Sequence, residues 1–203
     1  MISINKLDAN EKAIFLDIAC FCIKEDKTYA DYMWCSSGYS PHSAIDVLLL
    51  MSLIKIDEHN SFWMHDEVRD LGRYIVMAEN FEDAEKRRWV QIDENTQVIL
   101  RSKEEKGAIR ALSLDISHDF TPEEITYLPK LRFLGGENLN FLGDFKNDSP
   151  NMRWLSWRLC PPDFLATNLH LGNLVVLNIS MSNITDDWGG WRQTKVLFEV
   201  VYD

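Results

Sequence analysis

A repeat in the second half of the chain constrains its fold more than any other feature. Four segments share the pattern apolar, variable, apolar, Leu, and they begin at residues 109, 131, 152 and 174, at spacings of 22, 21 and 22. Leu112, Leu134, Leu155 and Leu177 therefore occupy equivalent positions. In repeat proteins each unit contributes one short element and neighbouring units bury the apolar positions between them. The pattern predicts that these four leucines lie on neighbouring rungs of one stack.

The period lies in the range of leucine-rich repeats, whose units each contain one strand. A fifth unit would begin at Val196, where Val196 and Phe198 fit the pattern but Glu199 occupies the leucine position. End repeats usually carry a polar capping face, and no such face is evident before Asp203. We therefore expect the beginning of a solenoid that is truncated at this end.

The first residues of the chain predict a group of helices. The apolar run over residues 13–23 is interrupted only by Asp17, which indicates one largely buried helix. A short helix fits residues 29–35, and Ser40 followed by Pro41 is a typical start for a third helix that extends to Met51.

The hydrophobic period then changes from helical to alternating. Residues 53–57 and 61–65 alternate around the polar segment 58–60, which predicts a β-hairpin. Asp66 is a favoured N-cap residue and begins a helix with apolar residues at helical spacing. Three helices, a hairpin and a closing helix follow the order of a winged-helix domain.

Between the two halves, residues 80–88 are dense in charge and residues 98–100 indicate one short helix. The predicted organisation is α+β: a winged-helix domain over 1–80, a charged helical linker over 81–107 and leucine-rich repeats over 108–203.

Charge argues against nucleic acid as a partner. The formal net charge is −11, and residues 1–80 contain seven Lys or Arg and thirteen Asp or Glu, a balance of 7 − 13 = −6. A winged-helix protein that reads DNA needs a basic recognition helix, but the candidate helix over 41–51 contains no Lys or Arg. A winged-helix DNA-binding regulator is therefore the weakest of the functions considered.

The motifs of catalysis and metal binding are missing from the sequence. It contains no GxxxxGK[ST], GxGxxG or GxSxG segment and no CxxC pair. Cys20 and Cys22 fall in an apolar run and are expected to be buried free thiols. The polar residues 1–12 do not resemble a signal peptide. We expect a cytoplasmic protein without enzymatic activity, metal or membrane segment.

Met64-His65-Asp66 is the one short motif that indicates a binding site. It joins the second hairpin strand to the following helix, where unpaired backbone N–H groups favour an anion. An imidazole N–H of His65 could donate to a phosphate oxygen there. The alternative is structural: a histidine packed at a strand end, with Asp66 as the helix cap.

These residues resemble a known family. The segment 11–21, EKAIFLDIACF, is similar to a helix motif of TIR-class plant disease-resistance proteins with nucleotide-binding and leucine-rich-repeat domains. Met64-His65-Asp66 with the following VRDLGR looks like the MHD motif of that family. The segments 152–157 and 174–177 resemble its first repeats, and residues 182–191, SNITDDWGGW, resemble flax rust-resistance-type receptors in particular.

The resemblance implies a molecular switch. In the family, ADP holds the receptor closed and exchange for ATP opens it, so that it assembles and signals. His65 would contact the nucleotide phosphate, Met64 would pack into the core, and Asp66 would cap the helix that positions His65. The repeats would contact pathogen effectors or the rest of the receptor. Because the phosphate-binding loop is missing from the sequence, this chain alone is expected to bind ADP weakly or not at all, and oligomers are expected only in the activated full-length receptor.

A second function, of a different class, stays open from the sequence. The chain could be a free-standing adaptor or decoy that binds a full-length receptor through its repeats.

Overall fold

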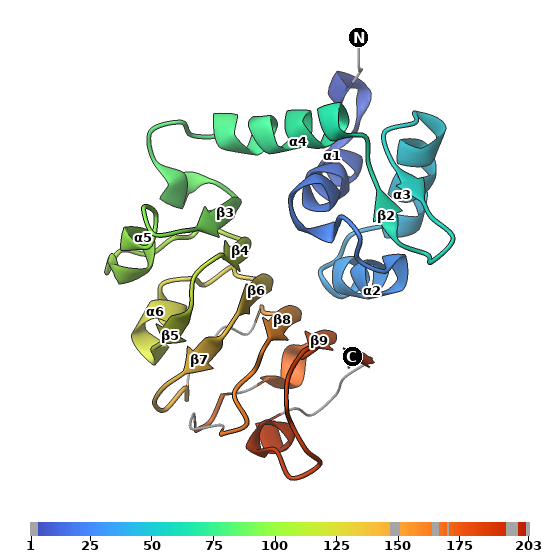
Figure 1. The fold of residues 1–203 in the computed structure, drawn as a ribbon. Coiled ribbons are helices and arrows are strands. Elements are labelled where there is room, and N and C mark those ends of the chain that lie inside the picture. Colours follow the sequence, from blue (N-terminus) through green and yellow to red (C-terminus); the bar gives the residue numbers. More distant parts are fainter. Residues whose placement is uncertain (1–3, 147–150, 164–166, 170, 194–198, 202–203) are drawn as a thin grey trace. The chain divides into compact units, whose positions relative to one another are not determined.

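The computed structural model describes residues 4–146, 151–163, 167–169, 171–193 and 199–201. The chain divides into two compact units, Met1–Phe81 and Glu82–Asp203 (Figure 1). No helix in the part of the chain that the structure describes has the length and apolar character needed to cross a bilayer.

The first unit is built of helices and one small hairpin. In chain order its elements are η1 (Ile4–Lys6), α1 (Ala9–Asp17), η2 (Ile18–Cys22), α2 (Lys27–Ser36), α3 (Pro41–Leu50), β1 (Lys55–Ile56), β2 (Phe62–Trp63) and α4 (Asp66–Ala78). The predicted order of three helices, a hairpin and a closing helix is confirmed. The apolar run over 13–23 is not one α-helix, however, because α1 ends at Asp17 and η2 continues as a π-helix.

The core of this unit lies between the helices and the hairpin. The Trp34 and Phe62 rings meet edge to face with centroids 5.8 Å apart, and the indole N–H of Trp34 donates to Asp17 at 2.9 Å. Cys20 and Cys22 are buried free thiols, as predicted. Burial raises the pKa of the Cys22 thiol, and nearby carboxylates raise it further, so this thiol stays protonated and has a packing role.

Helix α4 lies against η2 through two consecutive residues. A Cβ added to Gly72 would stand 2.5 Å from the Cβ of Ala19, so only glycine fits at this crossing. The next residue, Arg73, donates from Nε to the backbone oxygen of Ala19 at 3.1 Å. This hydrogen bond joins the Arg73 side chain to a backbone carbonyl of the π-helix. The packing of α4 thus depends on one missing methyl group and one guanidinium.

The hairpin is joined to the helices by backbone hydrogen bonds. The N–H of Lys24 donates to the Phe62 oxygen at 2.9 Å, and the N–H of Phe62 donates to the Glu25 oxygen at 3.1 Å. The turn is held by Asp57 Oδ1, which accepts from the N–H groups of His59 and Ser61. These contacts fix β2, which leads directly into α4.

The second unit is a stack of strand-and-loop repeats. Its elements are η3 (Ala84–Lys86), β3 (Trp89–Ile92), α5 (Val98–Arg101), β4 (Ala111–Leu114), β5 (His118–Phe120), α6 (Pro122–Thr126), β6 (Phe133–Glu137), β7 (Leu139–Phe141), β8 (Trp154–Arg158), η4 (Leu171–Asn173), β9 (Val176–Asn178), η5 (Gly189–Gln193) and β10 (Glu199–Val201). Six strands form a parallel sheet in the order β10-β9-β8-β6-β4-β3, and β5 and β7 form a second parallel pair (Figure 1).

The register of the sheet confirms the central prediction from the sequence. Leu112 pairs with Leu134, Leu134 with Leu155, and Leu155 with Leu177. All four side chains are buried in one hydrophobic cluster. The four equivalent leucines therefore lie side by side on neighbouring strands of the stack.

Two boundaries differ from those predicted. Within the expected helical linker over 81–107, α5 matches the predicted short helix, but Trp89–Ile92 forms β3 and pairs with β4, so this segment is part of the sheet. At the other end, Val200 and not Glu199 pairs with Leu177, so the fifth strand lies one residue later than the pattern predicts. Val196 and Phe198 lie outside the described residues.

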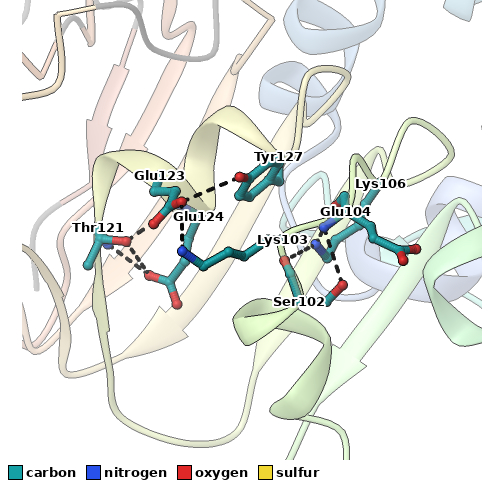
Figure 2. A network of polar contacts seen from close by, with 8 residues as sticks. All are labelled: Ser102, Lys103, Glu104, Lys106, Thr121, Glu123, Glu124 and Tyr127. Carbon is teal, nitrogen blue, oxygen red and sulfur yellow. Dashed lines mark hydrogen bonds and ion pairs between the residues drawn. The ribbon is translucent and has the colours of Figure 1, made fainter.

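A buried lysine holds the loop between α5 and β4 against α6. Lys106 donates from Nζ to the backbone oxygens of Ser102 and Glu104, each at 2.7 Å, and the ammonium lies 5.4 Å from the centre of the Tyr127 ring (Figure 2). A buried charge is costly unless it is paired or hydrogen-bonded, and these contacts satisfy it. Lys103 adds an exposed ion pair to Glu123 at 3.2 Å.

The turns after three successive strands repeat one unusual backbone conformation. Asn138, Leu159 and Met181 have φ values of 51°, 52° and 60°. This left-handed region is easy for Asn but costs about 1–2 kcal/mol for residues with larger side chains. Further along, Trp188 is buried with its ring centroid 5.7 Å from that of Trp157, so it anchors its loop to the core.

Candidate functional site

The candidate site is the junction between β2 and α4. Strand alternation buries Met64, which is 4% exposed, and leaves Trp63 and His65 on the surface. The burial of Met64 agrees with its predicted place in the core. Because Met64 anchors the chain in the core, the backbone on either side of it is fixed, and His65 is held at the start of α4.

His65 is the N-cap of α4. Its backbone is extended, with φ −63° and ψ 141°, and its Nδ1 accepts a hydrogen bond from the N–H of Glu67 at 3.3 Å. An N-cap side chain accepts from the second or third helical N–H, which His65 does with an imidazole nitrogen.

The prediction that Asp66 caps this helix is wrong. Asp66 is the first helical residue, and the N-cap must have an extended ψ, a conformation that His65 provides. The carboxylate of Asp66 instead pairs with Arg69 one turn later, at 2.9 Å. As an acid in the first turn, it still stabilises the helix through the dipole.

The capping contact assigns the proton of the imidazole. A neutral histidine has one donor and one acceptor nitrogen, and Nδ1 of His65 acts as the acceptor. The proton is therefore on Nε2, which can donate to an anionic oxygen. In this arrangement His65 offers one oriented N–H group for a ligand.

One neighbour of His65, and a lysine beside that neighbour, were not found from the sequence. The Trp63 ring lies edge to face with the imidazole, with centroids 6.3 Å apart, and Lys55 Nζ lies 5.0 Å from the centre of the Trp63 ring. Trp63 remains 44% exposed. Alternation along β2 places residues 63 and 65 on one side of the strand. This pattern could have predicted that their side chains are neighbours.

Acidic side chains limit what α4 itself can bind. Asp66 and Glu67 lie in its first turn and Asp70 follows. Arg69 is the basic residue among them. The dipole at the start of α4 is already complemented by the carboxylates of the helix. An anion at this junction would depend on the Nε2 proton of His65 more than on the backbone N–H groups.

The second unit contains a cavity of about 350 Å³, and its chemistry differs from that of the junction around His65. It is lined by Asn138, Asn140, Leu159, Cys160, Pro161, Pro162, Met181, Ser182 and Asn183. Burial raises the pKa of Cys160 to about 12, so its thiol is protonated near neutral pH and is a poor nucleophile. Among the described residues no group of three or more His, Cys, Asp or Glu side chains could hold a metal ion.

Comparison with known proteins decides what the first unit is. Residues 8–80 match the family model described as "Disease resistance protein Roq1-like, winged-helix domain". Residues 8–80 therefore form a winged-helix domain that is similar to the Roq1-like one. The matched segment contains the whole junction around His65, and the Roq1-like domain ends within two residues of the boundary between the two units.

The chain as a whole, Roq1-like domain and repeats together, is homologous to plant disease resistance proteins. It is 30% identical to Disease resistance protein RRS1 and 30% identical to Disease resistance protein RPP2A, both of Arabidopsis thaliana, over 96% of this chain in each case. It is 27% identical to Disease resistance protein RUN1 of Vitis rotundifolia over 90% of this chain. The matched region is 16% of each of these relatives, so the chain corresponds to a small part of them.

Proposed function

We propose that this chain is part of a cytoplasmic plant immune receptor of the TIR class and contributes the nucleotide-sensing end of its switch. What supports the proposal is the homology to disease resistance proteins, together with the cap at His65. The one observation that carries the site is the contact of Nδ1 with the Glu67 N–H, because it directs the Nε2 proton outward.

The residues of the junction fit one contact to a phosphate. ADP held by another part of the receptor would supply an anionic oxygen, and His65 would donate to it from Nε2. Met64 would keep β2 in the core, and Asp66 would stabilise the start of α4 through Arg69 and the dipole. Such a contact would join the winged-helix domain to a nucleotide domain in the closed state, and exchange for ATP would release it. The chain itself would carry out no chemical step.

The magnitude of one contact predicts that the chain alone binds ADP poorly. A hydrogen bond to a charged group contributes about 1.5–3 kcal/mol. A micromolar complex requires about 8 kcal/mol. Calorimetric titration of the isolated chain with ADP is therefore expected to give no measurable heat of binding, and micromolar affinity would contradict this assignment.

For the second unit we propose the start of a leucine-rich-repeat solenoid that contacts protein partners. The parallel strands at regular spacing and the buried leucine on four successive rungs support this proposal. We propose that the repeats begin near Arg87 instead of residue 108, because β3 pairs with β4 in the repeat register. For the first unit we propose the winged-helix domain over 1–80 that the sequence predicts.

The experiment that tests the switch is a chimera. This chain would replace the matching region of a full-length relative such as RUN1, and the chimera would be compared with its His65→Ala and His59→Ala variants. His59 is an exposed histidine in the hairpin turn of the same domain, which makes it a matched control.

We expect His65→Ala to lower the ADP content of the purified chimera and to cause defence signalling in leaves without a pathogen. His59→Ala should behave like the parent chimera. If His65→Ala retained as much ADP as the parent and stayed silent, the phosphate contact would be refuted.

A further inference from the structure

One face of the hairpin carries a cation beside the candidate site. Lys55 on β1 lies directly opposite Trp63 on β2 in the antiparallel pair. Side chains at such positions project to the same side, with Cβ atoms about 4.5–5.5 Å apart. Alternation along the chain places His65 on that side as well. These three exposed side chains, Lys55, Trp63 and His65, are called the hairpin face below.

The Trp63 ring lies against both polar groups of the hairpin face. Lys55 Nζ is 5.0 Å from the centre of this ring, and the imidazole of His65 meets the ring edge to face, with centroids 6.3 Å apart. The ring attracts the ammonium and so keeps it on this side of the hairpin. Because an ammonium has three N–H donors, Lys55 can still donate to a ligand.

Lys55 has no carboxylate partner among the described residues of its domain. The acids of the adjacent turn have other contacts, since Asp57 accepts from two backbone N–H groups and Glu58 lies 3.7 Å from His59. Residues 1–80 have a charge balance of 7 − 13 = −6. A lysine that remains without an ion pair in such an acidic domain is available to an anion from outside it.

A phosphate at this junction needs more than the N–H of His65. That N–H is a neutral donor, and the neighbouring carboxylates of Asp66 and Glu67 repel an anion. Arg69 does not compensate for them, because its guanidinium already pairs with two acids of α4. The ammonium of Lys55 supplies a positive charge on the same face as the imidazole, and a hydrogen bond between two charged groups is the stronger kind.

We propose that Lys55 donates from Nζ to the same diphosphate that His65 contacts, with Trp63 holding the ammonium in place. The inference rests on the proposed function, because the diphosphate would be that of ADP held by another part of the receptor. One charged donor and one neutral donor would then recognise it together. Two contacts are still too few for a micromolar complex, so the isolated chain is expected to bind ADP poorly.

The test is the rate at which the full-length chimera releases ADP. The parent chimera and its variants would be loaded with radiolabelled ADP, and the label retained on a filter would be followed over time. Lys55→Gln should release ADP at least about fivefold faster, because a hydrogen bond to a charged group is lost. Lys55→Arg keeps a charged donor and should release ADP at close to the parent rate.

Control variants separate this contact from general charge and from folding. Lys12→Gln removes the same charge at an exposed position on α1 and should leave the release rate unchanged. Trp63→Phe keeps an aromatic ring beside the ammonium and should behave like the parent, whereas Trp63→Leu should release ADP faster. Circular dichroism checks that each variant is folded, and the neutral Lys55→Met, of similar length, takes the place of Lys55→Gln if that variant is not.

Three results would each overturn the proposal. One is a parent release rate in the folded neutral variant of Lys55, another is equal acceleration by Lys55→Gln and Lys55→Arg, and the third is equal acceleration by Lys55→Gln and Lys12→Gln. His65→Ala, measured beside them, separates this inference from the proposed function. Faster release in His65→Ala with a parent rate in Lys55→Gln would refute only the lysine contact, whereas parent rates in both would also refute the phosphate contact of His65.

Discussion

Replacing Gly72 by Ala tests how α4, and with it His65, is held in the winged-helix domain. The new Cβ would lie 2.5 Å from the Cβ of Ala19. Carbon atoms in contact prefer about 3.5–4.0 Å, and neither Cβ can rotate away, so α4 must shift by about 1 Å.

Two destabilising effects and one stabilising effect set the magnitude of this change. Overpacking a core costs about 1–3 kcal/mol. The shift also strains the hydrogen bond from Arg73 to the Ala19 oxygen, which contributes about 0.5–1.5 kcal/mol. Alanine in place of glycine inside a helix returns about 1 kcal/mol. We therefore expect Gly72→Ala to lower the free energy of unfolding by about 1–3 kcal/mol.

Urea denaturation followed by far-UV circular dichroism measures this loss. The double variant Ala19→Gly with Gly72→Ala moves the methyl group to the other side of the contact, and it should be more stable than Gly72→Ala alone. Gly107→Ala is a control, because the nearest atom to its added Cβ is a flexible Glu105 oxygen at 3.4 Å. Native or higher stability of Gly72→Ala would refute the packing argument.

Three further predictions concern the second unit. Burial alone would raise the pKa of Glu124, but hydrogen bonds from His118 and Thr121 lower it below its ordinary value of 4.5. Glu124 therefore stabilises the fold above that pH, and the stability is lost as the pH falls further, so Glu124→Gln should flatten acid denaturation curves. Gly190→Ala would put a Cβ 2.2 Å from the Trp188 ring and should reduce near-UV circular dichroism and stability by about 1–3 kcal/mol. Met181→Asn, at an exposed residue with φ 60°, should raise the urea midpoint by an amount that corresponds to about 1 kcal/mol; an unchanged or lower midpoint would contradict this estimate.

The sequence predicted the repeat stack well because its signal is periodic. Each of Leu112, Leu134, Leu155 and Leu177 is buried for the same reason, so the four positions reinforce one another. The strand β3 escaped prediction because Arg87 stands where the pattern expects an apolar residue, although Val90 falls in phase, 22 residues before Leu112. A search that tolerated a polar first position and Val at the leucine position would have found it.

The candidate site was predicted in part. The motif located the junction, and alternation explains the burial of Met64, but the cap was assigned to Asp66 instead of His65. General cap preferences favour Asp over His, and only the backbone conformation could decide between two adjacent residues. The edge-to-face contact between Trp63 and His65 depends on side-chain directions that a one-dimensional pattern does not contain.

Because each described strand of the parallel sheet pairs with its neighbours in the stack, the second unit is modular. A duplication of one unit of 22 residues, inserted in phase, would lengthen the stack by about 4.8 Å without disturbing distant rungs. Genes that encode such arrays can therefore vary the length and chemistry of a contact surface by unequal recombination, one rung at a time, while each inserted unit brings its own buried leucine.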